Sequence, residues 1–128
     1  MTVRVLLADD EALIRAGFRL VLRPEHDIEL VGEAADGAAA VDGALRLRPD
    51  VVVMDVRMPG IDGLEATRRI KARPGPSPWI VALTAHALED DRRQCLAAGM
   101  NDFLSKPVQL QELTAALDRV PRTNVDAG

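Results

Sequence analysis

Side chains able to bind a cation or anionic oxygens stand at the ends of four apolar segments of this sequence. Asp9 and Asp10 follow one segment, Asp55 follows another, Thr84 closes a third, and Lys106 comes just after a fourth. Carboxylates gathered in one place would repel one another and raise the pKa of at least one of them unless a cation neutralised them. Mg²⁺ suits such a set, because it tolerates few protein oxygens together with waters and a phosphate oxygen. The pattern therefore predicts a magnesium site.

Thr84 and Lys106 are unnecessary for holding a metal ion, but a hydroxyl and an ammonium suit the oxygens of a phosphoryl group. An aspartyl phosphate is a known covalent species, and its cost is the placing of anionic oxygens against existing carboxylates. Mg²⁺, Lys106 and Thr84 would offset that cost. The chemistry predicted for this set is therefore phosphorylation of a carboxylate.

Asp55 is the predicted phosphorylated residue because of its position. It ends the apolar run Val51–Met54, and residues 58–63 form a loop that delays the next helix, so Asp55 caps nothing adjacent. A lone acidic residue after a strand is usually a helix N-cap. That interpretation stays open for Asp10, which is followed by Glu11-Ala12-Leu13.

These residues can meet only if the segment ends meet. Short apolar runs alternate with segments of helical period, which is typical of a parallel sheet covered by helices on both faces. In such open sheets, ligands bind at the carboxyl ends of the strands. The predicted fold class is α/β, a doubly wound (βα)5 domain with strands at Val3–Ala8, Ile28–Ala34, Val51–Met54, Ile80–Thr84 and Asp102–Leu104.

The intervening segments carry the helices. Apolar residues recur at helical spacing after each of the first three strands, and two more helices are expected around Leu88–Ala98 and Val108–Leu117. Proline-containing stretches separate the elements. Residues 1–120 are predicted to form one domain, with 121–128 as a flexible tail or linker stump.

Composition restricts the classes of function. The 128 residues are 48% hydrophobic and 28% charged, as in a soluble globular protein, and the net charge of −4 argues against direct binding of nucleic acid. No apolar stretch approaches the ~20 residues of a membrane span. The single Cys95 excludes an internal disulfide and a thiolate metal site. We therefore expect a cytoplasmic protein that does not contact membranes.

The whole pattern, from Val3 to about Val120, resembles the receiver domains of bacterial two-component response regulators. The family's acidic pair, phosphoacceptor aspartate, hydroxyl residue and Lys-Pro pair match Asp9 with Asp10, Asp55, Thr84, and Lys106 with Pro107. The resemblance implies a flavodoxin-like sheet of strand order 2-1-3-4-5. It also implies a cis peptide bond between Lys106 and Pro107.

The resemblance assigns further roles. The metal ligands would be Asp9, Asp10, Asp55 and the backbone carbonyl of Arg57, and Thr84 with Phe103 would switch position on phosphorylation. By analogy Arg57 and His86 flank the phosphoryl pocket and tune hydrolysis, although both could equally be solvated residues. The alternative for Phe103 is plain core packing, which is the commonest role of a phenylalanine.

The resemblance also implies partners. A histidine kinase or histidine phosphotransfer protein would donate the phosphoryl group, and an output domain or partner would meet the face formed by the fourth helix, fifth strand and fifth helix. It leaves room for a homodimer that forms on phosphorylation. The protein would not be an enzyme, but a phosphoacceptor that assists its own phosphorylation and dephosphorylation.

Two alternatives remain from the sequence. Residues 3–70 resemble receivers attached to LuxR-type DNA-binding domains, whereas 83–87 and 98–107 resemble receivers of hybrid histidine kinases, so both output branches stay open. A magnesium phosphatase of the haloacid-dehalogenase type uses similar residues. That family places an Asp-x-Asp motif first and the acidic pair last, whereas here the acidic pair comes first and Asp55-Val56-Arg57 lacks the second aspartate.

Overall fold

The computed structural model describes residues 2–85 and 89–121, and within them five strands alternate with five helices. In chain order these elements are β1 (Val3–Ala8), α1 (Ala12–Leu22), β2 (Ile28–Ala34), α2 (Gly37–Leu47), β3 (Val51–Asp55), α3 (Gly63–Lys71), β4 (Trp79–Thr84), α4 (Glu89–Ala98), β5 (Asp102–Ser105) and α5 (Leu110–Asp118). No helix of the described residues is long and apolar enough to cross a membrane.

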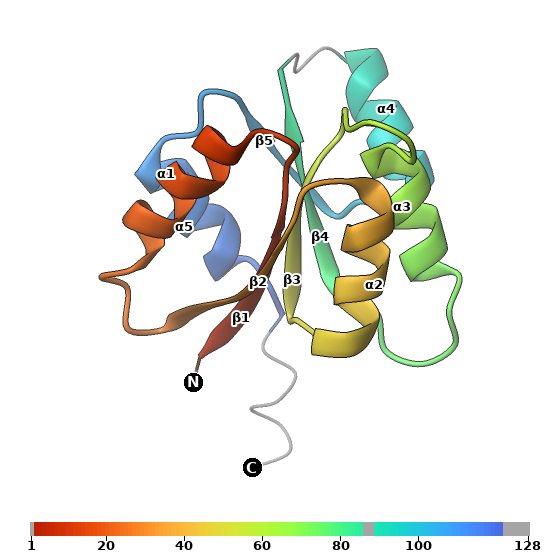
Figure 1. Ribbon diagram of the computed structural model, residues 1–128. Helices are drawn as coiled ribbons and strands as arrows, with labels where there is room; N and C mark the ends of the chain where they lie inside the picture. The colour runs from red at the N-terminus through yellow and green to blue at the C-terminus, as the bar shows by residue number, and fades with distance from the viewer. Residues whose placement is uncertain (1, 86–88, 122–128) are drawn as a thin grey trace.

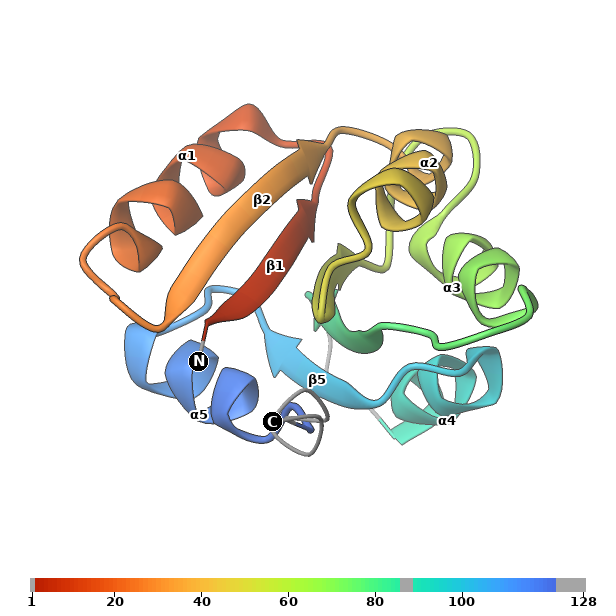
Figure 2. The same cartoon turned by 90° about the horizontal axis from the view of Figure 1, so that it is seen from below.

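The strands form one parallel sheet in the order β2-β1-β3-β4-β5, so the predicted doubly wound fold and its strand order are confirmed. The strand order reverses between β1 and β3. The chain passes from β1 to β2, which pairs along one edge of β1, and then crosses to β3, which pairs along the other edge of β1. Helices α1 and α5 cover one face, and α2, α3 and α4 cover the other (Figure 1 and Figure 2).

The side chains of each strand alternate between the two faces of the sheet, and this explains why a hydrophobic core lies on each face. Successive side chains of a strand point to opposite faces, and Val51 and Val53 pack with α1 and α5 while Val52 and Met54 pack with α2 and α3. All four are buried. A strand buried on both faces must be apolar throughout, which is why β3 contains no polar residue before Asp55.

The predicted boundaries differ from the structure by a few residues at some ends. Strand β4 begins at Trp79 and β5 continues to Ser105, because each extra residue extends the parallel pairing with its neighbour. Helix α5 begins at Leu110 rather than Val108, and Val108 packs against the core in the loop before it. Leu88, expected to start the fourth helix, and residues 122–128 of the expected tail lie outside the described residues.

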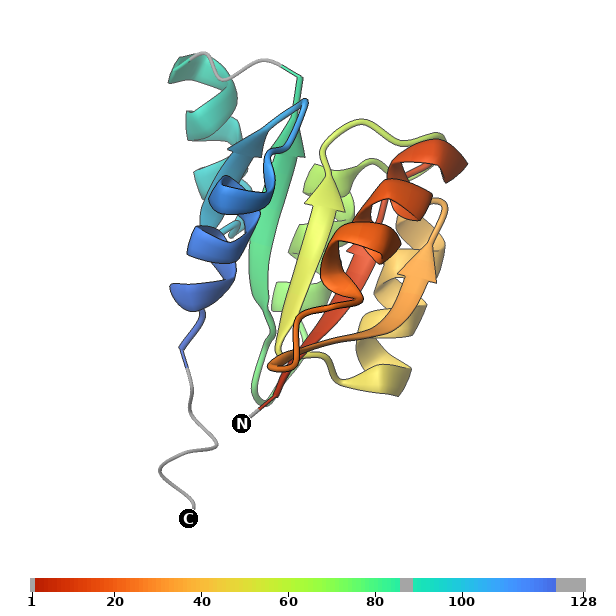
Figure 3. The ribbon, with the colours of Figure 1, turned by 90° about the vertical axis from the view of Figure 1, so that its left-hand side faces the viewer.

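All strands point the same way, so their carboxyl ends lie at one edge of the sheet (Figure 3). Asp9 directly follows β1, Asp55 is the last residue of β3, Thr84 is the last of β4, and Lys106 directly follows β5. The fold thus gathers the residues singled out from the sequence at a single edge.

Candidate functional site

Three carboxylates meet at this edge. Asp9, Asp10 and Asp55 each offer an oxygen, and these oxygens lie within 4.8 Å of one another. Asp9 and Asp55 are buried, whereas Asp10 is exposed. The arrangement combines two carboxylates shielded from water with one that faces solvent.

Asp55 lies in an environment that disfavours its charged form. Burial of its carboxyl group and the negative charge of Asp9 raise the pKa of Asp55 from 3.8 to about 6, against the opposing effects of Lys106 and the Arg57 N–H group. The Arg57 N–H donates to Asp55 Oδ1 over 3.3 Å. The repulsion expected from the sequence is therefore present in the structure.

Lys106 is the cation that faces this cluster. Its Nζ lies 3.0 Å from Asp9 Oδ2 and 3.2 Å from Asp55 Oδ2. Burial lowers the pKa of Lys106, but the two carboxylates outweigh burial and raise it above the ordinary lysine value. Lys106 therefore carries a positive charge, and its peptide bond to Pro107 is cis.

Asp9 is held from several directions. Its N–H group donates to Ala34 O at the end of β2, and its Oδ1 accepts from the Glu11 N–H over 2.9 Å. Arg15 on α1 donates to its backbone carbonyl oxygen over 2.6 Å. Asp10 is not the helix N-cap, because Glu11 occupies that position. The N-cap interpretation of Asp10 is therefore wrong, and the pair Asp9-Asp10 belongs to the carboxylate cluster.

The loop after Asp55 returns close to it. Asp62 caps α3 by accepting from the Glu65 N–H, and the Gly63 N–H donates to Val56 O. A side chain at position 63 would place its Cβ 2.1 Å from Asp55 O, a distance no packed structure tolerates. Gly63 thus allows α3 to begin directly against the backbone of Asp55.

Thr84 and Arg57 line a hollow beside Asp55, together with Asp91 and Cys95 on α4. Thr84 is buried at the tip of β4, while Arg57 is exposed. On the next strand, Phe103 is half-buried and the Arg92 guanidinium lies 5.6 Å from its ring centroid. His86 lies outside the described residues, and His26 is exposed in the loop between α1 and β2.

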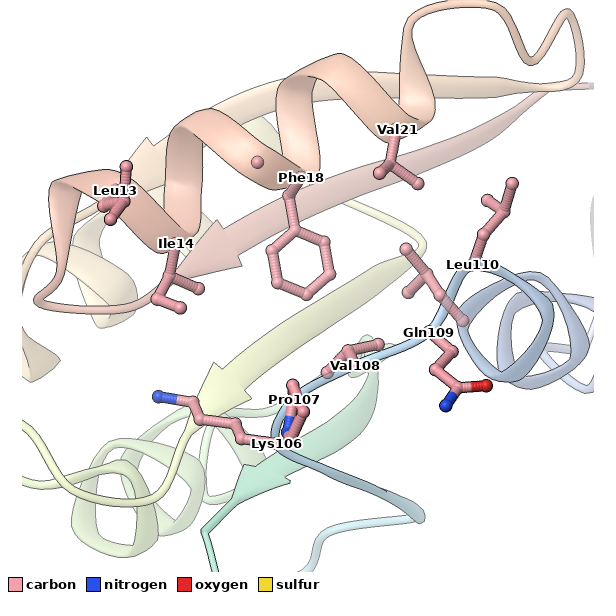
Figure 4. Close-up of a pocket in the computed structure, with 11 residues that line it drawn as sticks. Leu13, Ile14, Phe18, Val21, Lys106, Pro107, Val108, Gln109 and Leu110 are labelled. Atoms are coloured by element: carbon pink, nitrogen blue, oxygen red, sulfur yellow. The ribbon is translucent and has the colours of Figure 1, made fainter.

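Sequence reasoning missed two features near Lys106. One is the contact of Arg15 with Asp9, for which an arginine in the second turn of a helix gives no signal. The other is an apolar pocket between α1 and the segment before α5, in which Phe18 and Val108 face each other while Lys106 extends away from them (Figure 4). The pocket is rimmed by exposed Leu13 and Leu110. A leucine in an amphipathic helix can be predicted to be exposed only when the buried face of that helix is already known.

The carboxylates fit a hard divalent cation. Asp9 Oδ2 is buried and receives no hydrogen bond within the described residues; its contact with Lys106 is an ion pair without hydrogen-bond geometry. Among the described residues, the Lys106 ammonium pairs with two of the three carboxylates, Asp9 and Asp55, which leaves net negative charge at the cluster. Oxygen ligands in this number are what Mg²⁺ takes when it keeps several waters.

Comparison with known proteins identifies the family. The family model described as the response regulator receiver domain matches residues 5–118. This chain therefore belongs to the receiver domains of two-component response regulators. The resemblance stated from the sequence is thereby confirmed, and the match lends no support to the phosphatase alternative.

Individual relatives agree. The chain is 42% identical over 118 residues to response regulator UvrY of Escherichia coli (strain K12), covering 92% of this chain and 54% of UvrY. It is 40% identical to the magnesium-containing receiver domain of sensor histidine kinase PA1611 from Pseudomonas aeruginosa PAO1, with a TM-score of 0.83 and 94% and 98% of the two chains covered. It is 29% identical to the receiver domain of Ssk1 from Saccharomyces cerevisiae, solved with the phosphotransfer protein Ypd1, with a TM-score of 0.82 and coverage of 93% and 88%. The chain spans about half the length of the curated relatives it matches.

The raised pKa of Asp55 predicts a pH-dependent cost in stability. Because the folded protein binds this proton more tightly than the unfolded chain does, the free energy of unfolding falls as pH rises from about 4 to about 6, and the whole cost is present above that range. In the absence of divalent ions, Asp55→Asn should therefore be more stable than wild type by about 3 kcal/mol near neutral pH. The advantage should shrink toward about pH 4, as measured by urea unfolding in EDTA.

Asp42→Asn is the control, since Asp42 is an exposed carboxylate paired with Arg46 and should change stability little at either pH. An equal difference between wild type and Asp55→Asn at both pH values would contradict the electrostatic interpretation.

Proposed function

We propose that this domain receives a phosphoryl group on Asp55 from a histidine kinase or a histidine phosphotransfer protein, and that Mg²⁺ is required. The observation that carries the proposal is the buried carboxylate of Asp55 at the tip of β3, which clusters with the carboxylates of Asp9 and Asp10 and has Lys106 Nζ 3.2 Å from its Oδ2. A metal ion and an ammonium placed around one carboxylate suit transfer of an anionic group to it.

In the proposed reaction, an Asp55 carboxylate oxygen attacks the phosphorus atom of a phosphohistidine. A P–O bond forms, the P–N bond breaks, and its electron pair stays on the imidazole nitrogen of the donor. Lys106, already an ion-pair partner of Asp55, is placed to pair with an oxygen of the transferred group. Thr84 at the tip of β4 supplies a hydroxyl on the same edge.

The proposed ligands of Mg²⁺ are Asp9, Asp10, Asp55 and the backbone carbonyl of Arg57. When bound, the ion would neutralise the carboxylates and the incoming phosphoryl oxygens. The clustering of the three carboxylates supports this set, as does the magnesium ion in the active-site cleft of the PA1611 receiver.

A protein donor is supported by the surface next to Lys106. Leu13 is 82% exposed and Leu110 is 47% exposed, and both border the apolar pocket of Figure 4. A small phosphodonor would not need an apolar surface of this kind, whereas a protein would bury it on docking. The complex of the Ssk1 receiver with Ypd1 provides a precedent for a phosphotransfer protein as partner.

The rest of the proposal follows the family. The protein is a signal transducer that assists its own phosphorylation and dephosphorylation, and residues 1–120 form the receiver. We place it in the cytoplasm, where the buried free Cys95 stays reduced. The output is a partner or attached domain at the face formed by α4, β5 and α5, and a homodimer that forms on phosphorylation is one such partner.

Thr84 and Phe103 are the proposed switch residues. Thr84 ends β4, and Phe103 lies on the neighbouring strand β5. Across these two strands, Thr84 pairs with Ser105 and Ala82 pairs with Phe103. The ring of Phe103 is half-buried and packs against the core on the α4 side of the sheet. Movement of Thr84 toward a phosphoryl oxygen would vacate space that this ring can fill.

Labelling tests the acceptor. Wild type incubated with acetyl phosphate and Mg²⁺ should gain the mass of one phosphoryl group, and Asp55→Asn should gain none. Of the two described carboxylates that contact Lys106, Asp55 is the last residue of its strand and keeps some exposure, whereas the Asp9 side chain is fully buried. Intact-protein mass spectrometry measures the gain. Asp42→Asn, which removes an exposed carboxylate paired with Arg46 on α2, is the control and should label like wild type.

The acceptor assignment is wrong if Asp55→Asn labels as readily as wild type. Labelling of the wild type that persists at the same rate in EDTA would remove the magnesium requirement instead.

A second test concerns how phosphorylation is transmitted through Thr84 to residues 89–98 and Phe103. Beryllofluoride with Mg²⁺, which stands in for the phosphoryl group, should shift the NMR signals of residues 89–98 and Phe103 in wild type and in Thr84→Ser, which keeps the hydroxyl. The shifts should be strongly reduced in Thr84→Ala, since a ligand moves an equilibrium only through its differential contacts. Shifts in Thr84→Ala equal to those in wild type would refute the coupling through Thr84.

A further inference from the structure

We propose that Arg15 is a positioning residue for the magnesium site and acts by fixing the turn that carries Asp9 and Asp10. The inference rests on the proposed function of the acidic cluster, but it concerns a residue on α1 whose hydrogen bonds go to Asp9 O and Glu33 rather than to Asp55 or Lys106. Its side chain is 18% exposed, so the guanidinium group is largely enclosed.

The guanidinium of Arg15 joins three elements. Its Nη1 donates to the backbone carbonyl oxygen of Asp9 over 2.6 Å, and its Nε donates to Glu33 Oε1 on β2 over 3.2 Å. Glu33 is held in place in turn by Arg19, whose Nη1 lies 2.6 Å and 2.7 Å from its two carboxylate oxygens. Arg15 therefore ties the turn after β1 both to α1 and to the end of β2.

This contact completes the fixation of Asp9. The Asp9 N–H group already donates to Ala34 O, and Asp9 Oδ1 accepts from the Glu11 N–H. With Arg15 on the carbonyl oxygen, the backbone donor, the backbone acceptor and one carboxylate oxygen of Asp9 all have defined partners. The other carboxylate oxygen, Oδ2, is the one that faces Lys106 and the cluster. Loss of the Arg15 contact would free the turn to rotate and would disperse the carboxylates, which repel one another.

A lysine or a glutamine could not replace this contact equally well. The guanidinium is a planar fork whose donors point in fixed directions, so one residue can bind a carbonyl oxygen and a carboxylate at the same time. Partners that orient metal ligands commonly contribute about tenfold to a hundredfold in metal affinity. A contact through the backbone of a ligand residue belongs at the lower end of that range.

The direction of the change in Mg²⁺ affinity distinguishes a positioning role of Arg15 from a simple effect of its charge. Arg15 is a cation near a cation site, so removal of its charge alone would strengthen Mg²⁺ binding through space. Removal of a positioning contact would weaken Mg²⁺ binding instead. Arg19 provides the matched control, because it is on the same helix and pairs with the same Glu33, whereas only Arg15 of the two donates to Asp9 O.

The experiment compares Arg15→Met with Arg19→Met, since methionine keeps an aliphatic stem and removes one positive charge in both variants. Mg²⁺ is titrated into each protein at constant ionic strength and followed by NMR. We expect the half-saturating Mg²⁺ concentration to rise about tenfold in Arg15→Met and to stay unchanged or fall in Arg19→Met. With acetyl phosphate, the labelling rate of Arg15→Met should recover toward that of wild type when Mg²⁺ is saturating.

A second measurement needs no metal. Hydrogen exchange of the Glu11 amide, which donates to Asp9 Oδ1, should be faster in Arg15→Met than in wild type and unchanged in Arg19→Met. If Arg15→Met does not fold, Arg15→Lys takes its place with Arg19→Lys as control, and the same differences are expected because lysine lacks the fork.

Equal Mg²⁺ affinity and equal Glu11 exchange in the Arg15 and Arg19 variants would overturn the positioning role while leaving the receiver function intact. A wild-type protein that neither binds Mg²⁺ nor becomes phosphorylated would show instead that the proposed function fails.

Discussion

Repulsion among carboxylates is the constraint on which this structure depends. Two of the three, Asp9 and Asp55, are buried, and desolvation, reinforced by the negative charge of Asp9, raises the pKa of Asp55 to about 6. The apo protein offsets part of this cost with Lys106, whose ammonium lies between them. The remaining negative charge suits a divalent cation, so the cost in stability and the proposed capacity for binding have the same origin.

The parallel sheet makes this concentration of charge tolerable. The central strands β3 and β4 are apolar on both faces until their last residues, Asp55 and Thr84, and the cores on the two faces of the sheet hold these strand ends in place. Short backbone contacts then fix the turns, among them Gly63 against Asp55 O and Arg15 on Asp9 O. The site is therefore rigid at its base, while the rim formed by Asp10, Arg57 and the start of α4 is exposed.

The sequence was sufficient for the elements and for the edge at which they place Asp9, Asp55, Thr84 and Lys106, because alternating apolar runs determine which strands are buried and parallel strands end together. It was less informative where a residue has two plausible local partners. Asp10 could have been an N-cap, and the distinction depends on where α1 begins, which is at Ala12 with Glu11 as the N-cap. The contact of Arg15 and the exposure of Leu13 depend on how α1 is rotated against β2, a consequence of packing that no local pattern records.

The central claim is that the carboxylate cluster is strained without a metal ion and relaxed with one. Urea unfolding of the wild type and of Asp10→Asn, each with MgCl₂ and with NaCl of equal ionic strength, tests it most directly. A ligand that binds only the folded state stabilises it in proportion to the logarithm of its concentration above Kd. The account predicts that MgCl₂ raises the free energy of unfolding of the wild type and that most of this gain is lost in Asp10→Asn. An equal effect of MgCl₂ and NaCl on the wild type would contradict it.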